Sequence, residues 1–440
     1  MVETPTERFT KCIQYFDSVG FRGLTTSETS QIIQLFAQEL QGGLQNPPNP
    51  GSLKMIDTHL FPLSSDNLRH YHVGEEALIL EIGGTNVFAA WVTIGSDGVP
   101  RILRDPSSNK ELSMRGELRK RVFNSPQEFF HEALHHVNDI VARKQITALG
   151  IIYSFPASVV DVPLGVDVMS PASLPKGFYI DGIDAKPVGS ALIEHMRASG
   201  VYHMDTLDSL VVLNDTPAAL LSTPSKIGGI VGTGYNLAMS VEGKIFNIEC
   251  GGFHHVPQHP FVEKVDKKSA NPGLQRAEKQ IAGMYLGAQL EAVIETLVDL
   301  NVIHVRKTPE FGEENLPAEV VSHIIDRNIE KLTEYIYGDF TEEALSILYD
   351  AAMRLRNRSA QIVGAKLATI VRTFPDEFPD EQIIVPIEGS VFWKMSGYKD
   401  CVCSQANILT GKDFQFPYID HAGSVGAAAA VVGRRTIRLK

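Results

Sequence analysis

The chain has 440 residues, of which 43% are apolar, and it carries a formal net charge of −12. A single hydrophobic core is unusual at this length, so two packed lobes are expected. The acidic balance, without a block of like charges, argues against binding to nucleic acid or to an anionic membrane and leaves room only for a local basic cleft.

The cysteines and the N-terminus indicate the compartment. Four cysteines are too few and too scattered for a disulfide framework, which favours a reducing environment. Cys401-Val402-Cys403 lies on a strand-like run without a second Cys or His pair nearby, so it carries little weight as a zinc site. The first 30 residues lack a basic leader with an apolar core, and no stretch is long enough to span a bilayer. We expect a soluble, cytoplasmic protein.

The N-terminal region is expected to be helical. Apolar residues recur at helical spacing between Thr6 and Leu40, with Thr26 and Ser27 as possible caps. Residues 42–52 then hold three prolines and three glycines, which cannot continue a helix and predict a linker or surface loop.

The sequence pattern in the middle of the chain predicts alternating strands and helices, as in an α/β fold. Strands are predicted over 77–82 and 87–94, with residues 95–98 as a hairpin-like turn. A helix beginning at Ser125-Pro126 and running to about Arg143 precedes a buried strand over 148–153, and a helix over 188–198 precedes another over 210–213. Continuous apolar strands separated by helices indicate a sheet covered on both faces.

The last third is predicted to be rich in helix. After Gly283 we expect helices over 289–300, 317–337 and 342–372, followed by one more buried strand over 382–387.

Three glycine-rich segments, residues 80–86, 230–234 and 421–424, each follow an apolar run. One such turn usually only connects two strands, but three together suggest a phosphate held between two halves of the molecule. Glycines let backbone N–H groups approach an anion, and Thr or Ser adds a hydroxyl donor. The chain is thus a candidate nucleotide-binding enzyme.

Polar side chains follow several predicted strands, which is where α/β sheets place ligands. They include Ser154, Asn214-Asp215, and residues 232–236 and 247–251. Taken alone, Asn214-Asp215 is more simply a cap of the next helix. As a set, amides that donate and accept and carboxylates that accept suit a polyhydroxyl ligand such as a sugar.

These segments resemble the motifs of the hexokinase family over nearly the whole chain and in the same order. Leu80 to Asn86 resembles the family's Leu-Asp-Leu-Gly-Gly-Thr-Asn, and Leu213 to Thr216 its Val-Asn-Asp-Thr. The other matching segments are Ser52 to Ile56, Ser154-Phe155-Pro156, Pro175-Lys176-Gly177-Phe178, Ile230 to Asn236, Asn247 to Phe253, Asn271-Pro272-Gly273, Glu278-Lys279 and Gly283 to Gly287.

The resemblance implies the two-lobed actin-like ATPase fold, a ribonuclease H-like α/β architecture with a sugar-binding cleft between the lobes. Residues 75–214 and 425–440 would form the small lobe, and residues 1–74 and 215–424 the large lobe. The implied substrates are a hexose and ATP, with Mg²⁺ as the metal; neither nucleic acid nor membrane is expected as a partner, and the oligomeric state stays open.

The resemblance also implies a role for individual residues. Asp215 would be the general base for the sugar's 6-hydroxyl, and Lys176 would lie near the transferred phosphoryl group. Hydroxyl-binding residues would be Ser154, Lys176, Asn214, Asp215, Asn236, Glu249 and Glu278. Nucleotide-binding residues would be Gly83, Gly84, Thr85, Asn86, Gly232, Thr233, Gly234, Ser390, Gly423 and Ser424. Glu81 would serve the metal through a water molecule.

The sequence departs from the family's motifs mostly on the phosphate side. Glu81 stands where the family's first phosphate motif has Asp. Phe88 stands where the family has Arg, two residues after the Asn of the same motif. Further departures are Pro175, Tyr235, Cys250, Glu388 and Val425. They keep two alternatives open: a sugar-binding regulator with weak or lost catalysis, and a kinase that uses another phosphoryl donor or another hexose.

One histidine cluster needs a separate interpretation. His254, His255 and His259 could suggest a metal site, but no acid accompanies them at helical spacing, so a solvated loop is the favoured interpretation.

Overall fold

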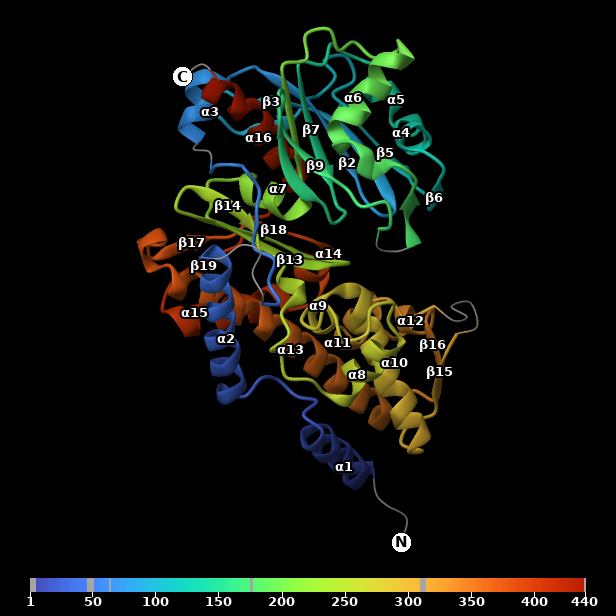
Figure 1. Cartoon of the computed structure of the whole chain (residues 1–440). Coiled ribbons are helices and arrows are strands. Elements are labelled where there is room, and N and C mark those ends of the chain that lie inside the picture. The colour runs from blue at the N-terminus through green and yellow to red at the C-terminus, as the bar shows by residue number, and fades with distance from the viewer. Residues whose placement is uncertain (1–4, 46–50, 63–64, 175–176, 309–313, 439–440) are drawn as a thin grey trace.

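The structure is a computed structural model that describes the chain apart from residues 1–4, 46–50, 63–64, 175–176, 309–313 and 439–440. Among the described residues, an eight-stranded sheet and a five-stranded sheet form the framework. Figure 1 shows the larger sheet with α4 to α6 in the upper part of the view, the smaller sheet in the middle, and α8 to α13 below it.

The larger sheet has the order β4-β3-β2-β7-β11-β9-β8, and β5 also pairs with β3. Its strands are β2 (Glu76–Ile82), β3 (Asn86–Ile94), β4 (Pro100–Ile102), β5 (Ser113–Glu117), β7 (Ala148–Tyr153), β8 (Ser158–Val162), β9 (Gly165–Met169) and β11 (Ser209–Leu213). β2, β7 and β11 run parallel and are almost entirely buried. Their continuous apolar sequences are therefore explained by cover on both faces.

The smaller sheet has the order β1-β14-β13-β12-β18. Its strands are β1 (Ile56–Asp57), β12 (Ile227–Val231), β13 (Tyr235–Val241), β14 (Lys244–Asn247) and β18 (Ile387–Glu388). Two-stranded pairs are β6 (Val122–Phe123) with β10 (Tyr179–Ile180), β15 (Val305–Lys307) with β16 (Ile336–Gly338), and β17 (Gln382–Ile384) with β19 (Asp413–Gln415).

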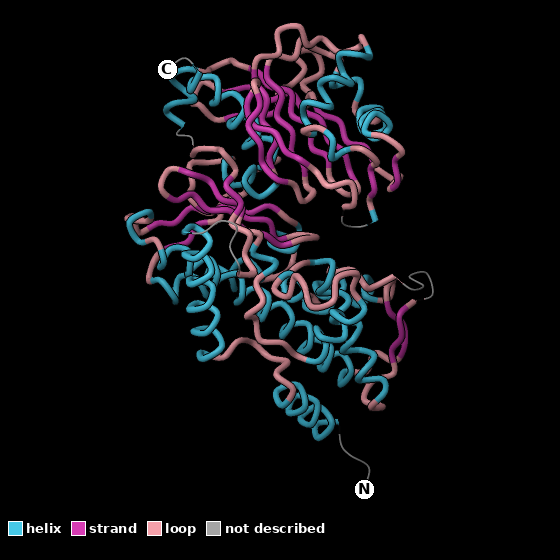
Figure 2. The backbone as a smooth tube through the Cα atoms, in the orientation of Figure 1, coloured by secondary structure: helices cyan, strands magenta, loops and turns pink. Residues whose placement is uncertain are grey.

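Helices surround both sheets (Figure 2). The N-terminal half contains α1 (Pro5–Ser18), α2 (Thr26–Gln45), α3 (Ser65–Tyr71), α4 (Pro126–His135), α5 (Asn138–Val141), α6 (Val188–Ser199) and α7 (Asp215–Leu221). The C-terminal half contains α8 (Pro260–Lys268), α9 (Glu278–Ile281), α10 (Gly283–Asp299), α11 (Glu319–Ile325), α12 (Ile329–Leu332), α13 (Glu342–Thr373), α14 (Ser390–Lys394), α15 (Tyr398–Thr410) and α16 (Ala422–Arg438).

The hydrophobic core has separate parts. One lies between the larger sheet and α4 to α6, and another joins the smaller sheet to α2, α10 and α13. A third contains residues of both sheets together with α7 and α16. These two helices therefore connect the two halves of the molecule.

The N-terminal helix that was expected over Thr6 to Leu40 is divided into α1 and α2. Gly20 adopts a left-handed conformation (φ +73°), and the Phe21 N–H donates to the Phe16 carbonyl at 2.8 Å. This arrangement is a common end of helices at glycine. The expected linker is also shorter, because α2 continues to Gln45, and residues 46–50 lie outside the described part of the chain.

Thr25 caps α2, so the expectation of a cap at Thr26 or Ser27 is wrong. The Thr25 hydroxyl accepts from the Glu28 N–H at 3.2 Å, and the Glu28 carboxylate accepts from the Thr25 N–H at 2.8 Å. This reciprocal capping box also lowers the pKa of Glu28, in spite of a partial burial that acts in the opposite direction.

Other local expectations hold with altered boundaries. The Ser125 hydroxyl caps α4, but that helix stops at His135 and a separate α5 follows. The region 317–337 breaks into α11, α12 and β16, and 382–387 splits into strands of two different sheets. The strand expected around Cys401 and Cys403 is wrong, because both cysteines lie on α15.

The cap of α2 gives a stability prediction. Thr25→Ala removes the side-chain acceptor and should destabilise the first turn of α2 by about 1 kcal/mol, which corresponds to roughly fivefold faster local opening. Hydrogen exchange of the amides in that turn measures the effect. Thr26→Ala is the matched control, and equal acceleration in both variants would contradict the assignment of the cap.

Candidate active site

The register of the parallel strands brings some of the predicted site residues, among them Ser154 and Asn214, to one end of the larger sheet. Ile82 pairs with Tyr153, and Ile152 pairs with Leu213, so β2, β7 and β11 end level with one another. Gly83, Ser154 and Asn214 follow these ends directly. The Ser154 N–H donates to the Ile82 carbonyl at 3.2 Å, which keeps the two chain segments together beyond the strands.

Asp215 begins α7 at this end of the sheet. The Asn214 side chain caps the helix by accepting from the Thr216 N–H at 3.2 Å. The Thr216 hydroxyl donates to Asp215 Oδ1, also at 3.2 Å. The capping interpretation of the motif is therefore confirmed for Asn214, while Asp215 is held by its neighbour at the same end of the sheet.

Three carboxylates act on one another here. Burial raises the pKa of Glu81, and the nearby Asp215 raises it further, while Arg115 opposes both effects. Glu388, at the end of β18, has its pKa raised to about 7 by burial first and then by Glu81 and Asp215. Because β2 belongs to the larger sheet and β18 to the smaller sheet, the site contains carboxylates from both sheets.

The second and third glycine-rich segments lie beside Glu388. A Cβ on Gly389, which has φ +123°, would collide with the Val231 backbone, and one on Gly232 would lie 3.0 Å from the Gly389 Cα. The Gly423 N–H at the start of α16 hydrogen bonds to the Glu388 carboxylate. The turn at 232–234 therefore packs against Gly389-Ser390, and the third segment opens a helix.

The first glycine-rich turn joins β2 to β3. The Gly83 N–H donates to the Asn86 carbonyl at 3.0 Å, and the Asn86 amide donates to the Thr85 hydroxyl at 3.1 Å. Both Thr85 and Asn86 are exposed. Glu81 lies two residues before this turn and interacts electrostatically with Asp215 and Glu388.

A second group of polar side chains lies on the smaller sheet. The Asn236 amide donates to Asn247 Oδ1 at 2.7 Å and to Glu249 Oε1 at 3.1 Å. Asn247 also donates to Glu249, at 2.8 Å, and Glu278 Oε1 accepts from the Tyr235 N–H at 3.3 Å. Glu278 thus lies beside the second glycine-rich turn, and Asn236 and Asn247 together hold the Glu249 carboxylate.

The sequence predicts no individual role for Asn247, although residues 247–251 are among the polar segments that follow predicted strands. Asn247 is only 5% exposed, and the signal for it was present, because it begins the quoted segment that contains Glu249. Lys176 and Pro175 lie outside the described residues.

The structure corrects part of the interpretation of the histidine segment as a solvated loop. His254 and His255 are exposed, as expected of a solvated loop, but His259 is buried and caps α8 by accepting from the Val262 N–H. Burial, and then the charge of Arg358, lowers the pKa of His259 to about 3, which keeps it neutral. Among the described residues, no group of three His, Cys, Asp or Glu side chains is placed to hold a metal ion alone.

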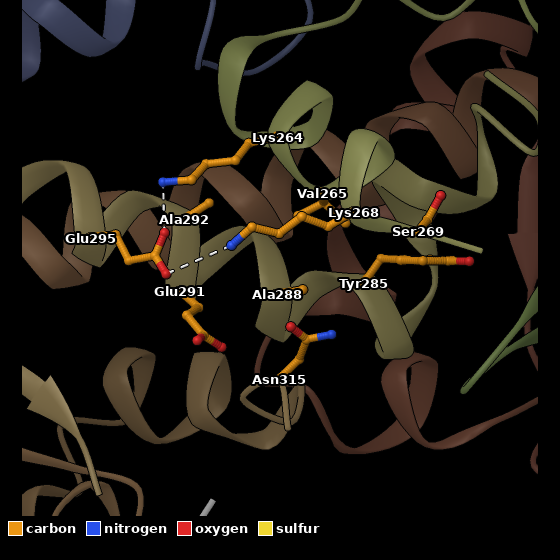
Figure 3. Close-up of a pocket in the computed structure, with 10 residues that line it drawn as sticks. All are labelled: Lys264, Val265, Lys268, Ser269, Tyr285, Ala288, Glu291, Ala292, Glu295 and Asn315. Atoms are coloured by element: carbon orange, nitrogen blue, oxygen red, sulfur yellow. Dashed lines mark ion pairs between the residues drawn. The ribbon is translucent and has the colours of Figure 1, made fainter. Parts of the chain in front are cut away.

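A pocket lies elsewhere, between α8, α10 and the segment around Asn315 (Figure 3). Lys264 pairs with Glu295 at 2.6 Å, and Lys268 approaches the same carboxylate at 4.0 Å. The lysines are therefore neutralised within the pocket, and none of its lining residues is a predicted site residue.

The comparisons with known proteins identify the family. Two models, each described as Hexokinase, match residues 22–224 and 226–432. The chain belongs to the hexokinase family. Human Hexokinase-2 is 24% identical over 94% of this chain and 48% of its own length, so the chain spans about half of that relative. Hexokinase-1 of Schizosaccharomyces pombe is 25% identical over 92% of this chain and 87% of its own length.

A solved structure shows the same fold. The hexokinase from Schistosoma mansoni, described as complexed with glucose, matches with a TM-score of 0.77 at 19% identity, over 98% of this chain and all of that one. The expected two-lobed actin-like α/β fold is confirmed. Across the described residues, no helix has the length and apolar character that a bilayer crossing requires.

The raised pKa of Glu388 predicts how stability depends on pH. Between its ordinary value of 4.5 and about 7, the folded chain binds more protons at this carboxyl than the unfolded chain does. Stability contributed by this group is therefore lost as pH rises through that window. Glu388→Gln should show a smaller fall in melting temperature from pH 5 to pH 8 than the wild type. Glu381→Gln, at an exposed carboxyl, is the control, and coincident profiles for Glu388→Gln and wild type would refute the prediction.

Proposed function

We propose that the chain is an ATP-dependent hexokinase that transfers the γ-phosphoryl group of Mg-ATP to the 6-hydroxyl of glucose or a related hexose. The observation that carries the proposal is the position of Asp215, which follows a buried parallel strand and lies beside Glu81 and Glu388 among glycine-rich turns. Membership of the hexokinase family supports the same reaction class.

In this mechanism Asp215 accepts the proton of the 6-hydroxyl as that oxygen forms a bond to the γ-phosphorus. The bond between this phosphorus and the bridging oxygen breaks, and ADP leaves with the electron pair. Lys176 stabilises the charge on the phosphoryl oxygens, where a cation is most effective. Ser154, Asn214, Asn236, Glu249 and Glu278 bind the other sugar hydroxyls.

The carboxylates fit a magnesium-bound nucleotide. Mg²⁺ prefers oxygen ligands and usually keeps several waters, binding through one or two carboxylates and the substrate's phosphates. Glu81 would hold it through water, a role that requires no complete protein cage. When bound, the ion supplies positive charge to the phosphoryl oxygens. The glycine-rich turns 83–86 and 232–234, with Ser390, Gly423 and Ser424, would hold the phosphates through N–H and hydroxyl donors.

The proposal includes the assignment of lobes. We assign residues 75–214 and 425–440 to the small lobe and the rest to the large lobe, with the hexose between them. Support comes from the position of α16, which packs on the larger sheet although it ends the chain. A cytoplasmic location is part of the same proposal.

A sugar-binding regulator is the second candidate. It is favoured by the departures at Glu81, Phe88 and Val425. Phe88 and Val425 each lack the charge of the basic residue that the resemblance expects. A coupled assay with glucose, Mg²⁺ and ATP separates the two. Glucose-dependent consumption of ATP supports the kinase, whereas glucose binding by calorimetry without turnover supports the regulator.

Removal of the proposed base tests the mechanism. Asp215→Ala should lower turnover by ~10²–10⁴ or more, because proton transfer is lost, while hexose binding is largely kept. The coupled assay measures turnover and calorimetry measures binding. Asp205→Ala, at an exposed acid before the same strand, is the control. Near wild-type turnover in Asp215→Ala would rule out the mechanism.

The sugar-binding group can be tested without catalysis. Glu249→Gln keeps one oxygen for Asn236 and Asn247 but replaces the other acceptor, so hexose binding should weaken by about 1–3 kcal/mol. Glu278→Gln should act in the same direction. Calorimetric titration with glucose measures both, with the exposed Glu263→Gln as control. Unchanged affinity in both variants would remove the sugar site from these positions.

A further inference from the structure

Three residues on neighbouring strands lie side by side at the end of the larger sheet that carries Glu81, which we call the acidic end. Glu81 on β2 pairs directly with Phe88 on β3, and Phe88 pairs directly with Arg115 on β5. Directly opposed residues of antiparallel strands point to the same face of the sheet. The side chains of Glu81, Phe88 and Arg115 therefore form one row.

Phe88 is held in this row by two contacts. Its ring stacks on the His421 ring, with centroids 5.1 Å apart and an interplanar angle of 8°. The Arg115 guanidinium lies over the Phe88 ring, 5.6 Å from its centroid. A cation over an aromatic face is weakly attracted to it, and the ring provides a platform that orients the guanidinium.

Arg115 has no competing partner in the described part of the chain. Its side chain is exposed, and within the described residues its guanidinium makes no hydrogen bond or ion pair. Nearby Arg119, in contrast, is paired with Glu117 at 2.9 Å. The five donors of Arg115 are thus available to a ligand at the acidic end of the sheet.

Arg115 is also placed to offset the negative charge of the nearby carboxylates. Its charge acts on both Glu81 and Glu388, in opposition to the burial of these two carboxyls. A polyphosphate that approaches these acids is repelled unless cations offset their charge. A guanidinium can bind phosphate through two parallel hydrogen bonds, which fits a nucleotide at the adjacent turn 83–86.

We propose that Arg115 binds the phosphate chain of the nucleotide from β5, and thereby supplies the positive charge that Phe88 does not. This assignment rests on the proposed kinase function and adds a phosphate-binding residue to it. In this arrangement Phe88 and His421 support the guanidinium rather than contact the phosphates, so the departure at residue 88 is compensated on the neighbouring strand.

Binding of Mg-ADP and of adenosine to purified full-length protein tests the proposal by calorimetry. Arg115→Gln should weaken Mg-ADP binding roughly 10- to 100-fold, because it loses charged hydrogen bonds, and change adenosine and glucose binding less than about twofold. Arg115→Lys should retain part of the affinity. Arg119→Gln is the matched control and should bind as the wild type does.

A charge-relocation variant separates phosphate binding from a structural role. Phe88→Arg combined with Arg115→Gln should recover Mg-ADP affinity if the charge is what matters. Wild-type Mg-ADP affinity in Arg115→Gln, with glucose phosphorylation intact, would overturn only the role of Arg115. A wild type that binds glucose but neither binds Mg-ADP nor consumes ATP would overturn the proposed function, and the role of Arg115 with it.

Discussion

The repulsion between three carboxylates is the constraint on which the site depends. Glu81, Asp215 and Glu388 lie on three different elements, and burial, together with the charges of Glu81 and Asp215, raises the pKa of Glu388 to about 7. Such a cluster costs stability unless the fold holds it in place or a cation neutralises it. Functional sites are where this cost is often retained. The function proposed above would supply such a cation, because the Mg²⁺ that accompanies the nucleotide carries positive charge.

The close packing of α7 and α16 holds the acids together. A Cβ on Gly426 of α16 would collide with the Ala218 carbonyl of α7, and one on Gly228 of β12 would collide with the Leu220 backbone. α7 begins at Asp215, and α16 begins beside Glu388 through Gly423. Glycine at these contacts allows the two helices and the smaller sheet to approach closely. The same packing that connects the sheets thus sets the distance between the acids.

The two polar groups of the site differ in how they are stabilised. Asn236, Asn247 and Glu249 hydrogen bond to one another, so the side chains that we propose to bind the sugar hydroxyls are already held in place within the fold. The group that we propose to lie beside the phosphates is instead acidic, and Arg115 offsets its charge only in part. This difference agrees with the sequence, in which the departures from the hexokinase motifs fall mostly on the phosphate side. A substitution such as Phe88 is best judged together with the residue that faces it across the sheet.

The sequence by itself determined the elements whose pattern is local. The strand over Ala148–Tyr153, the hairpin around residues 83–86 and the helix from Val188 follow from apolar runs, glycine and spacing. The order of motifs also predicted the family and most of the candidate site. Only the tertiary structure decided that Glu388 lies beside Glu81, that Arg115 covers Phe88, that His259 is buried and that Cys401 is helical. The contacts among Glu81, Glu388, Phe88 and Arg115 depend on which distant segments become neighbours, and a local pattern carries no information about a partner far away in the sequence.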